Sequence, residues 1–516
     1  MLKKLPVDQR DFAEIRMENA IYADKTKIIY DLLNTLKYVV LKRPHGFGKS
    51  LLISVLKNLF EGKKELFKGL WIEERVDWKE YPVIVMDFST FDFTDKHLND
   101  GLDYVLNLNA EKYGLNLKAD SRRGRFMDLI ASLHEKTGKR VVLLVDGYNE
   151  AAKNHLDNPE ILDEYYKILL DFFAPVKPLG EDLHFVLFAG ELWFPKSSML
   201  SGDLNNLVDI SMDKNFAAIC GFTKEDLDKY FGEYKDAACE ELGLSRAELD
   251  EKIAFWYDGY KFDGRTRIYN PFSMLNFFAA KEFKNFWFES GLPKLLVDFI
   301  YKNGVDVKSF DNAMISEEAL NNFDVNKINL KALMFQTGYL TIAERNEFGQ
   351  YILNYPNEEV RRSFTRYLLD NFAETEQQDL DERKAALFRS LQICDIDGFI
   401  AGVNSLLASI PYQIIPKENE NYYSSLIYVL LRTLEYMVIS ELSSYHGRAD
   451  AVIKTKDYIY IFEYKMAPVT AAEGINQIKT QGYADEFMSD PRKKIAVSFV
   501  VDREKRQIVE CVSEEL

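Results

Sequence analysis

One stretch of the chain, VVLKRPHGFGKSLL (39–52), has the residues of a phosphate-binding loop. Gly48, Lys49 and Ser50 follow an apolar run, and the helical pattern of 49–62 comes next. In a P-loop, backbone N–H groups at the start of a helix surround the phosphates, the lysine binds the β- and γ-phosphates, and the hydroxyl binds Mg²⁺. The stretch therefore predicts a nucleotide site.

The loop departs from the G-x-x-x-x-G-K-[ST] signature at its first position, where Arg43 replaces glycine. A second half of the site lies in VVLLVDGYN (141–149), in which Asp146 ends a hydrophobic strand where a carboxylate would hold the Mg²⁺ shell. Hydrolysis also needs a residue that polarises the attacking water, but Gly147 and Asn149 follow, which argues against ATP hydrolysis. The expected nucleotide-binding residues are Arg43, Gly46, Gly48, Lys49, Ser50 and Asp146.

A second group lies in HGRADAVIKTKDYIYIFEYKM, which carries Asp450, Glu463 and Lys465. Residues two apart on a strand share a face, so Glu463 and Lys465 point together and Asp450 can meet them from the adjacent strand, while Tyr464 points into the packing on the other face. Two carboxylates form a hard oxygen site suited to Mg²⁺ or Mn²⁺. A neighbouring lysine can orient or deprotonate a water, or stabilise a pentacovalent phosphate. The group predicts metal-dependent phosphodiester hydrolysis.

An exposed cross-strand ion pair is the alternative interpretation of an E-x-K pair. The strand IYIFEYKM is too apolar to be exposed, so its charges must lie at its end or in a cleft. Asp450 precedes Glu463 by about the length of a hairpin, and Gln477 and Tyr483 follow on the next helix, where the amide can orient water or phosphate. The expected catalytic residues are Asp450, Glu463, Lys465 and Gln477, with Asp450 and Glu463 as the metal ligands.

Alternating strands and helices must position the residues of the predicted nucleotide site. Four buried apolar strands are predicted at 37–44, 81–89, 139–148 and 183–191. Amphipathic helices between them indicate a parallel sheet covered on both faces. From 221 to about 345 the pattern is mainly helical and aromatic-rich, with a hairpin or ordered loop at 256–271 and a helix that leads into a small hairpin within 331–356.

The elements that position the second group lie at the end of the chain. Residues 357 to about 435 have helical patterns. Strands are predicted at 449–455, 457–466 and 493–501, with a helix at 470–488. The fold class is therefore α/β and multidomain.

The amino-acid composition limits the class of protein and its cellular location. The 516 residues carry a formal net charge of −17 and are 47% hydrophobic, which predicts a globular protein and argues against a broad, non-specific grip on nucleic acid. Four cysteines form no C-x-x-C pair, as is typical of a reducing cytoplasm. There is no secretory signal pattern and no apolar run long enough for a bilayer, so we expect a cytoplasmic protein without a membrane partner.

Several segments resemble those of one family in their order along the chain. They are RPHGFGKSLL, YPVIVMDFS, LLVDGYN, SGDLNNLVDIS, GFTKEDL, YNPFSMLNFF, FQTGYLTI and YPNEEVRRSF. They resemble AAA-ATPase-like proteins with a C-terminal PD-(D/E)XK nuclease domain, a bacterial family, over nearly the whole chain. The resemblance implies a P-loop AAA-like domain at 1–212, a mainly helical lid or winged-helix-like domain at 213–356, and a restriction-endonuclease-like mixed α/β domain at 357–516.

The two groups compare differently with this family. Its loop usually reads RPRRFGKS, so arginine at the position of Arg43 is a family feature. Departures fall at His45, Gly46, Gly147, Asn149, Ala189 and Trp193. They cluster on groups that would sense or hydrolyse the γ-phosphate, which implies a decayed or regulatory nucleotide site. The nuclease pattern is matched at Glu441, Gly447, Arg448, Asp450, Glu463, Lys465, Gln477 and Tyr483, whereas Ser424 replaces a frequent histidine and receives no role.

The preferred interpretation is metal-dependent cleavage of nucleic acid by the C-terminal domain, regulated by a degenerate P-loop domain with ATP as its candidate ligand. Lys465 would position the nucleophile or stabilise the transition state, Gln477 would assist, and Arg448 would contact a phosphate. DNA is expected as the partner in preference to RNA, and the AAA-like resemblance implies a homo-oligomer. The alternative is a non-catalytic pseudo-ATPase that binds nucleotide, nucleic acid or protein.

Overall fold

The computed structural model describes residues 2–90, 98–153, 155–156, 158–192, 204–287, 296–300, 303–321, 324, 327–373, 377–409, 421–435 and 449–516. The chain forms two compact units. The N-terminal unit comprises Met1–Glu289 and Asp311–Val360, and the C-terminal unit comprises Ser290–Phe310 and Arg361–Leu516. Segment 290–310 therefore belongs with the C-terminal unit, although a piece of the N-terminal unit follows it. The finer domain boundaries at 212 and 356 stay a prediction.

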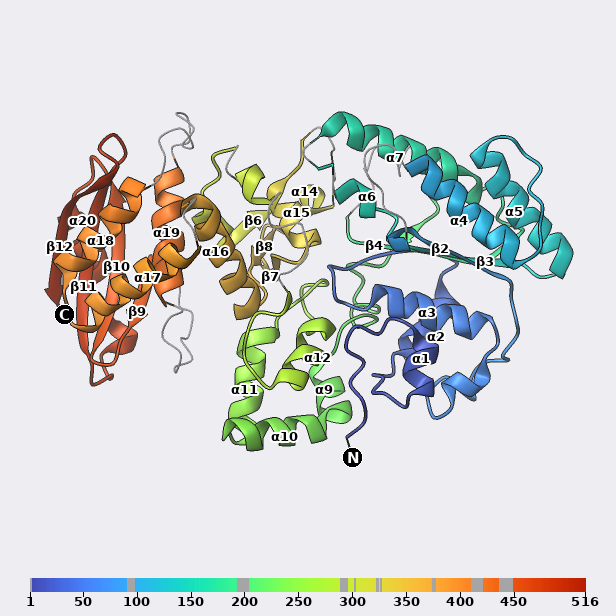
Figure 1. Cartoon of the computed structure of the whole chain (residues 1–516), viewed down its shortest axis with the longest axis horizontal. Coiled ribbons are helices and arrows are strands. Elements are labelled where there is room, and N and C mark those ends of the chain that lie inside the picture. The colour runs from blue at the N-terminus through green and yellow to red at the C-terminus, as the bar shows by residue number, and fades with distance from the viewer. Residues whose placement is uncertain are drawn as a thin grey trace. The chain divides into compact units, whose positions relative to one another are not determined.

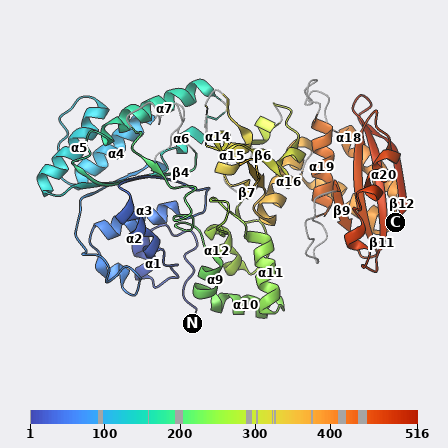
Figure 2. The ribbon, with the colours of Figure 1, turned by 180° about the vertical axis from the view of Figure 1, so that it is seen from behind.

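A parallel sheet in the order β2-β3-β4-β1-β5 organises the N-terminal unit. Its strands are β1 (Tyr38–Lys42), β2 (Val83–Asp87), β3 (Val141–Asp146), β4 (Leu183–Gly190) and the short β5 (Val208–Asp209). One face is covered by α1 (Phe12–Met17), α2 (Thr26–Thr35) and α3 (Lys49–Phe60), and the other by α4 (Leu98–Lys112), α5 (Arg122–Thr137) and α7 (Pro159–Phe173) (Figures 1 and 2). Every residue of β3 is buried, because helices cover both of its faces. The predicted parallel sheet is confirmed.

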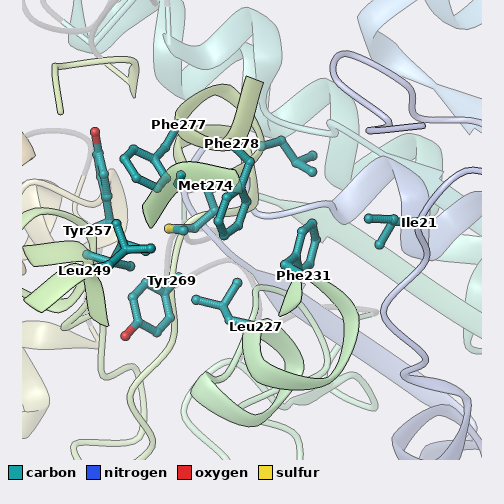
Figure 3. Packing of buried hydrophobic residues seen from close by; sticks show 12 residues of the cluster. Ile21, Leu227, Phe231, Leu249, Tyr257, Tyr269, Met274, Phe277 and Phe278 are labelled. Atoms are coloured by element: carbon teal, nitrogen blue, oxygen red, sulfur yellow. The ribbon is translucent and has the colours of Figure 1, made fainter. Parts of the chain in front are cut away.

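A helical region follows the sheet in the same unit. It contains α9 (Lys224–Tyr230), α10 (Gly232–Leu242), α11 (Arg246–Tyr257) and α12 (Pro271–Ala280). Their apolar faces enclose the cluster of buried residues in Figure 3. Thr223 and Asp226 form a capping box at the start of α9, as their spacing predicts. Tyr257 and Tyr260 are buried, so these aromatic rings belong to the core.

A small antiparallel sheet, in the order β6-β8-β7, completes the N-terminal unit. Its elements are β6 (Ala313–Ile315), α14 (Glu317–Leu320), α15 (Leu330–Gln336), β7 (Thr341–Arg345) and β8 (Tyr351–Asn354). The predicted helix and hairpin within 331–356 are confirmed, and β6 adds a strand that the pattern does not indicate. Within segment 256–271, residues 258–270 form an ordered loop between α11 and α12, with single antiparallel bridges at Phe222–Tyr269 and Tyr260–Ile268.

The C-terminal unit combines helices with a mixed sheet in the order β12-β11-β10-β9. Its helices are α17 (Gln377–Gln392), α18 (Ile396–Ser409), α19 (Tyr422–Glu435) and α20 (Ala471–Thr480), and the boundary between the units falls inside α16 (Glu358–Ala373). The strands are β9 (Ala451–Lys454), β10 (Tyr458–Met466), β11 (Lys493–Asp502) and β12 (Gln507–Glu515). β10 and β11 are parallel and α20 connects them, whereas β9 and β12 pair antiparallel with their neighbours.

Two features of this unit differ from the expectation. The helix predicted at 470–488 ends at Thr480, and a turn and the short 3-10 helix η6 (Asp485–Phe487) follow it. The strand β12 is not indicated by the sequence because it lies at the sheet edge, where polar side chains interrupt its apolar pattern. Among the described residues, no helix combines the length and apolar character that crossing a membrane requires.

Candidate functional site

The turn between β1 and α3 has the backbone of a phosphate-binding loop. Gly48 precedes the first residue of α3 with φ of 88°, and Gly46 has φ of 82°. Both angles lie in the left-handed region that glycine adopts without strain. A Cβ atom on Gly46 would also lie 2.8 Å from the Oδ1 atom of Asn270. The turn therefore requires these glycines, and it leaves the first N–H groups of α3 available for an anion.

A cavity of about 450 Å³ opens beside this loop. Five of the predicted nucleotide-binding residues line it, namely Gly46, Gly48, Lys49, Ser50 and Asp146. Its apolar wall includes Ile21, Leu52, Ile219, Phe222 and Leu275. A polar end for phosphates and an apolar wall for a ring fit a nucleotide.

The sixth predicted residue, Arg43, lies elsewhere. Its side chain is 1% exposed, and its guanidinium donates hydrogen bonds to the carbonyl oxygens of Lys42, Ser211 and Ala217. The guanidinium also lies over the ring of Phe262, 4.4 Å from its centroid. Arg43 does not line the cavity, so in this structure it braces the base of the loop instead of reaching toward a ligand.

Lys49 is turned back onto its own loop. Its Nζ donates to the carbonyl oxygens of Arg43 at 2.8 Å and Pro44 at 3.0 Å, and lies 3.6 Å from Oε1 of Glu191. Asp146 ends β3 beside α3; burial raises the pKa of its carboxyl, while a hydrogen bond from the Ser50 hydroxyl opposes that rise. The lysine, hydroxyl and carboxylate that a nucleotide and Mg²⁺ would need therefore surround one point.

The structure adds two carboxylates to this cavity that the sequence reasoning missed. Glu150 follows the turn after β3, and Glu191 follows the last residue of β4. Lys153 bridges them, with Nζ 3.0 Å from Oε1 of Glu150 and 2.9 Å from Oε2 of Glu191. Burial raises the pKa of Glu191, but the charges of Lys49 and Lys153 outweigh it and leave the pKa below its usual value. The position of Glu191 directly after an apolar strand was the available signal.

Asn149, the polar residue considered for the attacking water, has a structural contact. It is fully buried, and its Oδ1 accepts a hydrogen bond from the backbone N–H of Glu191 at 3.1 Å. The amide thus fixes the end of β4.

Three sequence motifs of the middle region contact the P-loop, either directly or through Trp287. Asn270 of YNPF and the indole of Trp287 both donate to the carbonyl oxygen of His45, at 3.1 and 3.3 Å. Gly338 of FQTGYL packs so closely that a Cβ atom there would lie 2.8 Å from Pro44. Glu359 of YPNEEV accepts the backbone N–H of Trp287 at 3.1 Å. These motifs therefore hold the loop in place.

The Glu359 carboxylate is the buried centre of this clamp. It also accepts the hydroxyl of Ser273 at 2.7 Å and the backbone N–H of Phe286 at 2.8 Å. Burial raises its pKa to about 7, which the three donors only partly oppose. A buried carboxyl with a raised pKa thus supports the P-loop indirectly, through its hydrogen bond with Trp287.

In the C-terminal unit, the predicted catalytic residues contact one another. On β10, Nζ of Lys465 lies 2.8 Å from Oε1 of Glu463 and 2.5 Å from Oε1 of Gln477, which projects from α20. The Nε2 of Gln477 in turn donates to the hydroxyl of Tyr483 at 3.1 Å. The predicted helix and strand thus fix the lysine from two sides.

Asp450 completes the carboxylate pair from the residue before β9. It is 2% exposed, its N–H donates to the carbonyl oxygen of Phe462, and its Oδ2 accepts the backbone N–H of Tyr464 at 2.9 Å. Burial and then the charge of Asp450 raise the pKa of Glu463, while Lys465 opposes the rise. The two carboxylates therefore repel each other at close range.

The donor set fits a divalent cation. Oε2 of Glu463 is buried, and no described residue forms a hydrogen bond with it. A bound cation would stabilise a buried carboxylate oxygen that has no hydrogen-bond donor and lies beside a second carboxylate. The described residues contain no group of three or more potential metal-binding side chains, so water and substrate would complete a shell that starts from Asp450 and Glu463.

The approach of α20 depends on a glycine. A Cβ atom on Gly474 would lie 2.1 Å from Oγ of Ser498 and 3.0 Å from its Cβ. Ser498 is fully buried and pairs directly with Glu463 in the β10–β11 register. Because Gly474 lets the helix come this close, Gln477, one turn further on, reaches Lys465.

Lys308 is the site residue that the sequence reasoning missed entirely. Its ammonium forms an ion pair with Oδ1 of Asp450, although it lies more than 100 positions upstream. No local motif marked it, because the fold alone brings η5 (Val307–Phe310) beside the sheet. Ser424, which received no role, has its hydroxyl 3.0 Å from that of Tyr464. Trp193, Glu441, Gly447 and Arg448 lie outside the described residues.

Comparisons with known proteins match the regions of the two candidate sites to two different families. Residues 6–200 match the family described as Predicted AAA-ATPase, and residues 418–511 match the PD-(D/E)XK nuclease superfamily. A protein of Azotobacter chroococcum mcd 1, described as "Uncharacterized protein in vnfD 5'region", is 34% identical over 527 residues, which cover 100% of this chain and 99% of that protein. The chain belongs to the family of AAA-ATPase-like proteins that carry a C-terminal PD-(D/E)XK nuclease domain.

Proposed function

We propose that the protein hydrolyses phosphodiester bonds of nucleic acid at Asp450, Glu463, Lys465 and Gln477, with Mg²⁺ or Mn²⁺, and that its P-loop domain regulates this activity. One observation carries the proposal: Lys465 is held between Glu463 and Gln477 while Oε2 of Glu463 is buried without a hydrogen-bond partner among the described residues. A buried oxygen left unpaired costs about 1–3 kcal/mol, and a cation bound between Glu463 and Asp450 would remove that cost.

Each residue has a distinct part in this proposal. Asp450 and Glu463 would hold the metal, which when bound activates a water and offsets charge on the phosphate. Lys465 is 19% exposed and fixed by two acceptors, so its ammonium is held beside Glu463, where it would stabilise charge on a phosphate bound at the metal. Gln477 keeps it there. The net charge of −17 makes recognition depend on local contacts, with DNA proposed in preference to RNA.

Strand cleavage tests the proposal directly. The full chain is incubated with labelled single- and double-stranded DNA and RNA in Mn²⁺, Mg²⁺ or EDTA. Lys465→Met is compared with Lys505→Met, a matched change at an exposed lysine of the β11–β12 turn. Cleavage that needs metal and is lost only in Lys465→Met supports the nuclease. Nucleic acid that is bound and never cut by folded protein contradicts it, and favours the alternative of a non-catalytic binding protein.

For the P-loop domain we propose nucleotide binding, with ATP as the ligand and without efficient turnover. The polar and apolar walls of the cavity support binding. Glu191, the carboxylate nearest Lys49, is paired with two lysines and has a lowered pKa, which makes it a weak base for activating water. Binding of a fluorescent ATP analogue that is lost in Lys49→Ala, with no phosphate release, is the expected result. Rapid phosphate release that depends on Glu191 would contradict it.

A further inference from the structure

A lysine outside the nuclease-family match contributes to the nuclease-like site. Lys308 lies in η5 (Val307–Phe310), whereas the match covers residues 418–511. Segment 290–310 nevertheless belongs to the same compact unit as β9, β10 and α20. The ammonium of Lys308 pairs with Oδ1 of Asp450, and its charge also acts on Glu463.

The backbone around Lys308 is fixed to α19, so this contact is built into the fold. The N–H of Val307 donates to the hydroxyl of Ser425 at 3.1 Å, and the side chain of Asn421 donates to the carbonyl oxygen of Gly304 at 2.8 Å. Val307 itself is buried. These contacts hold the chain just before Lys308 in place, beside the Asp450 carboxylate with which its ammonium pairs.

Each carboxylate oxygen of Asp450 and Glu463 has a different hydrogen-bonding environment. Of Asp450, Oδ2 accepts the N–H of Tyr464, and Oδ1 is left for Lys308. Of Glu463, Oε1 accepts Lys465, and Oε2 has no hydrogen-bond partner among the described residues. The oxygen of Asp450 that a cation would use is therefore the one that Lys308 occupies.

Charge and exposure distinguish the two lysines. Asp450 and Glu463 together carry two negative charges, which Lys308 and Lys465 balance. A divalent cation beside both ammonium groups would create a local excess of positive charge. The side chain of Lys308 is 48% exposed and that of Lys465 only 19%, so Lys308 can move into water at lower cost.

We propose that Lys308 is a further residue of the nuclease site, where its ammonium competes with the divalent cation for Oδ1 of Asp450 and so sets the metal concentration at which the site fills. The inference rests on the proposed function, since it takes Asp450 and Glu463 as metal ligands. It gives a chain segment outside the matched nuclease domain a role in metal binding.

Metal binding, measured apart from cleavage, tests the inference. Mn²⁺ is titrated into the full chain by calorimetry, with wild type, Lys308→Met, Lys308→Arg and the surface control Lys505→Met. We expect Lys308→Met to bind Mn²⁺ roughly fivefold more tightly, because a competing ion pair worth about 1 kcal/mol is removed. Lys308→Arg, which keeps the charge, and Lys505→Met should stay near the wild-type affinity.

The outcomes separate this inference from the proposed function. Equal or weaker Mn²⁺ binding in Lys308→Met, with binding still lost in Glu463→Gln, would overturn the competition while leaving the metal site in place. Mn²⁺ binding that is absent from every variant, or insensitive to Glu463→Gln, would overturn the metal site and the inference together. Thermal melts with and without Mn²⁺ give a second readout, in which the stabilisation by metal should be larger for Lys308→Met than for wild type.

Discussion

The two candidate sites each place a lysine next to carboxylates at the end of a buried strand, but they use it differently. In the N-terminal unit, Lys49 donates to carbonyl oxygens of its own loop and faces Glu191, which Lys153 also neutralises. In the C-terminal unit, Lys465 is held by Glu463 and Gln477, and one oxygen of Glu463 is left unpaired among the described residues. Lysines balance the carboxylates of both sites, and the second site differs in the buried Oε2 of Glu463, which has no hydrogen-bond partner among the described residues and is available to a cation.

This difference shows why a sequence motif alone does not measure activity. Lys49 and Asp146 match a working nucleotide site, yet Glu191 beside Lys49 is a weak base, because the charges of Lys49 and Lys153 outweigh its burial and lower its pKa. Asp450 and Glu463 instead raise the energy of the ionised pair, which a divalent cation would relieve. The balance of charge around the motif decides what it can do.

The largest expected effect is in the proposed nuclease site. Lys465→Met removes the ammonium while preserving most of the side-chain volume, so cleavage should fall by about 10³-fold. Gel-based initial rates at saturating Mn²⁺ measure this, and Lys505→Met is the control. A loss of less than about threefold would contradict the proposed difference between Lys465 and Lys49.

The next effect concerns the carboxylate behind the P-loop. The pKa of Glu359 is about 7 in the folded protein, against 4.5 without burial, so the stability it contributes is full below pH 4.5 and is lost as the pH rises to 7. Glu359→Gln should flatten the stability profile in this window, and at pH 8 it should raise the free energy of unfolding by up to about 3 kcal/mol. Urea unfolding followed by tryptophan fluorescence at several pH values measures it.

The neighbouring residue provides the control for that experiment. Glu358→Gln changes the adjacent, half-buried carboxylate and should leave the slope of the wild-type profile in place. An unchanged slope in Glu359→Gln would show that another group produces the pH dependence.

A smaller effect is expected where α20 contacts the sheet. Gly474→Ala inserts a Cβ atom against Ser498, so the free energy of unfolding should fall by about 2 kcal/mol and cleavage should weaken as Gln477 moves from Lys465. Adding Ser498→Ala should recover part of both losses, because it removes the closest atom. Denaturation and cleavage of the two single variants and the double variant measure the coupling. Strictly additive effects would contradict the close packing.

The smallest effect sharpens the comparison at the P-loop. Glu191→Gln removes the carboxylate that competes with phosphate for Lys49, so a fluorescent ATP analogue should bind roughly tenfold more tightly. The control is Glu164→Gln on the exposed face of α7. Weaker binding in Glu191→Gln would instead indicate that Glu191 orients the lysine toward the nucleotide.

Much of the fold could be predicted from local patterns. Continuous apolar runs such as that of β3 predict buried parallel strands because both faces need apolar side chains, and the structure confirms them. The pairing of Glu463 with Lys465 follows from the two-residue period of a strand, which is a local property. The edge strand β12 and the end of α20 at Thr480 were not predicted, because an edge strand need not alternate and the turn after Thr480 interrupts a pattern that remains helical.

The sequence by itself determined which residue types could handle phosphate and which strands and helices would carry them, since these depend on spacing along the chain. Tertiary structure alone decided that Arg43 is buried behind its loop, that Glu191 is paired with two lysines, and that Lys308 meets Asp450. The physical reason is that burial and charge depend on every neighbour in space. Contacts between distant segments, such as Lys308 with Asp450, leave no period or spacing in the sequence to reveal them.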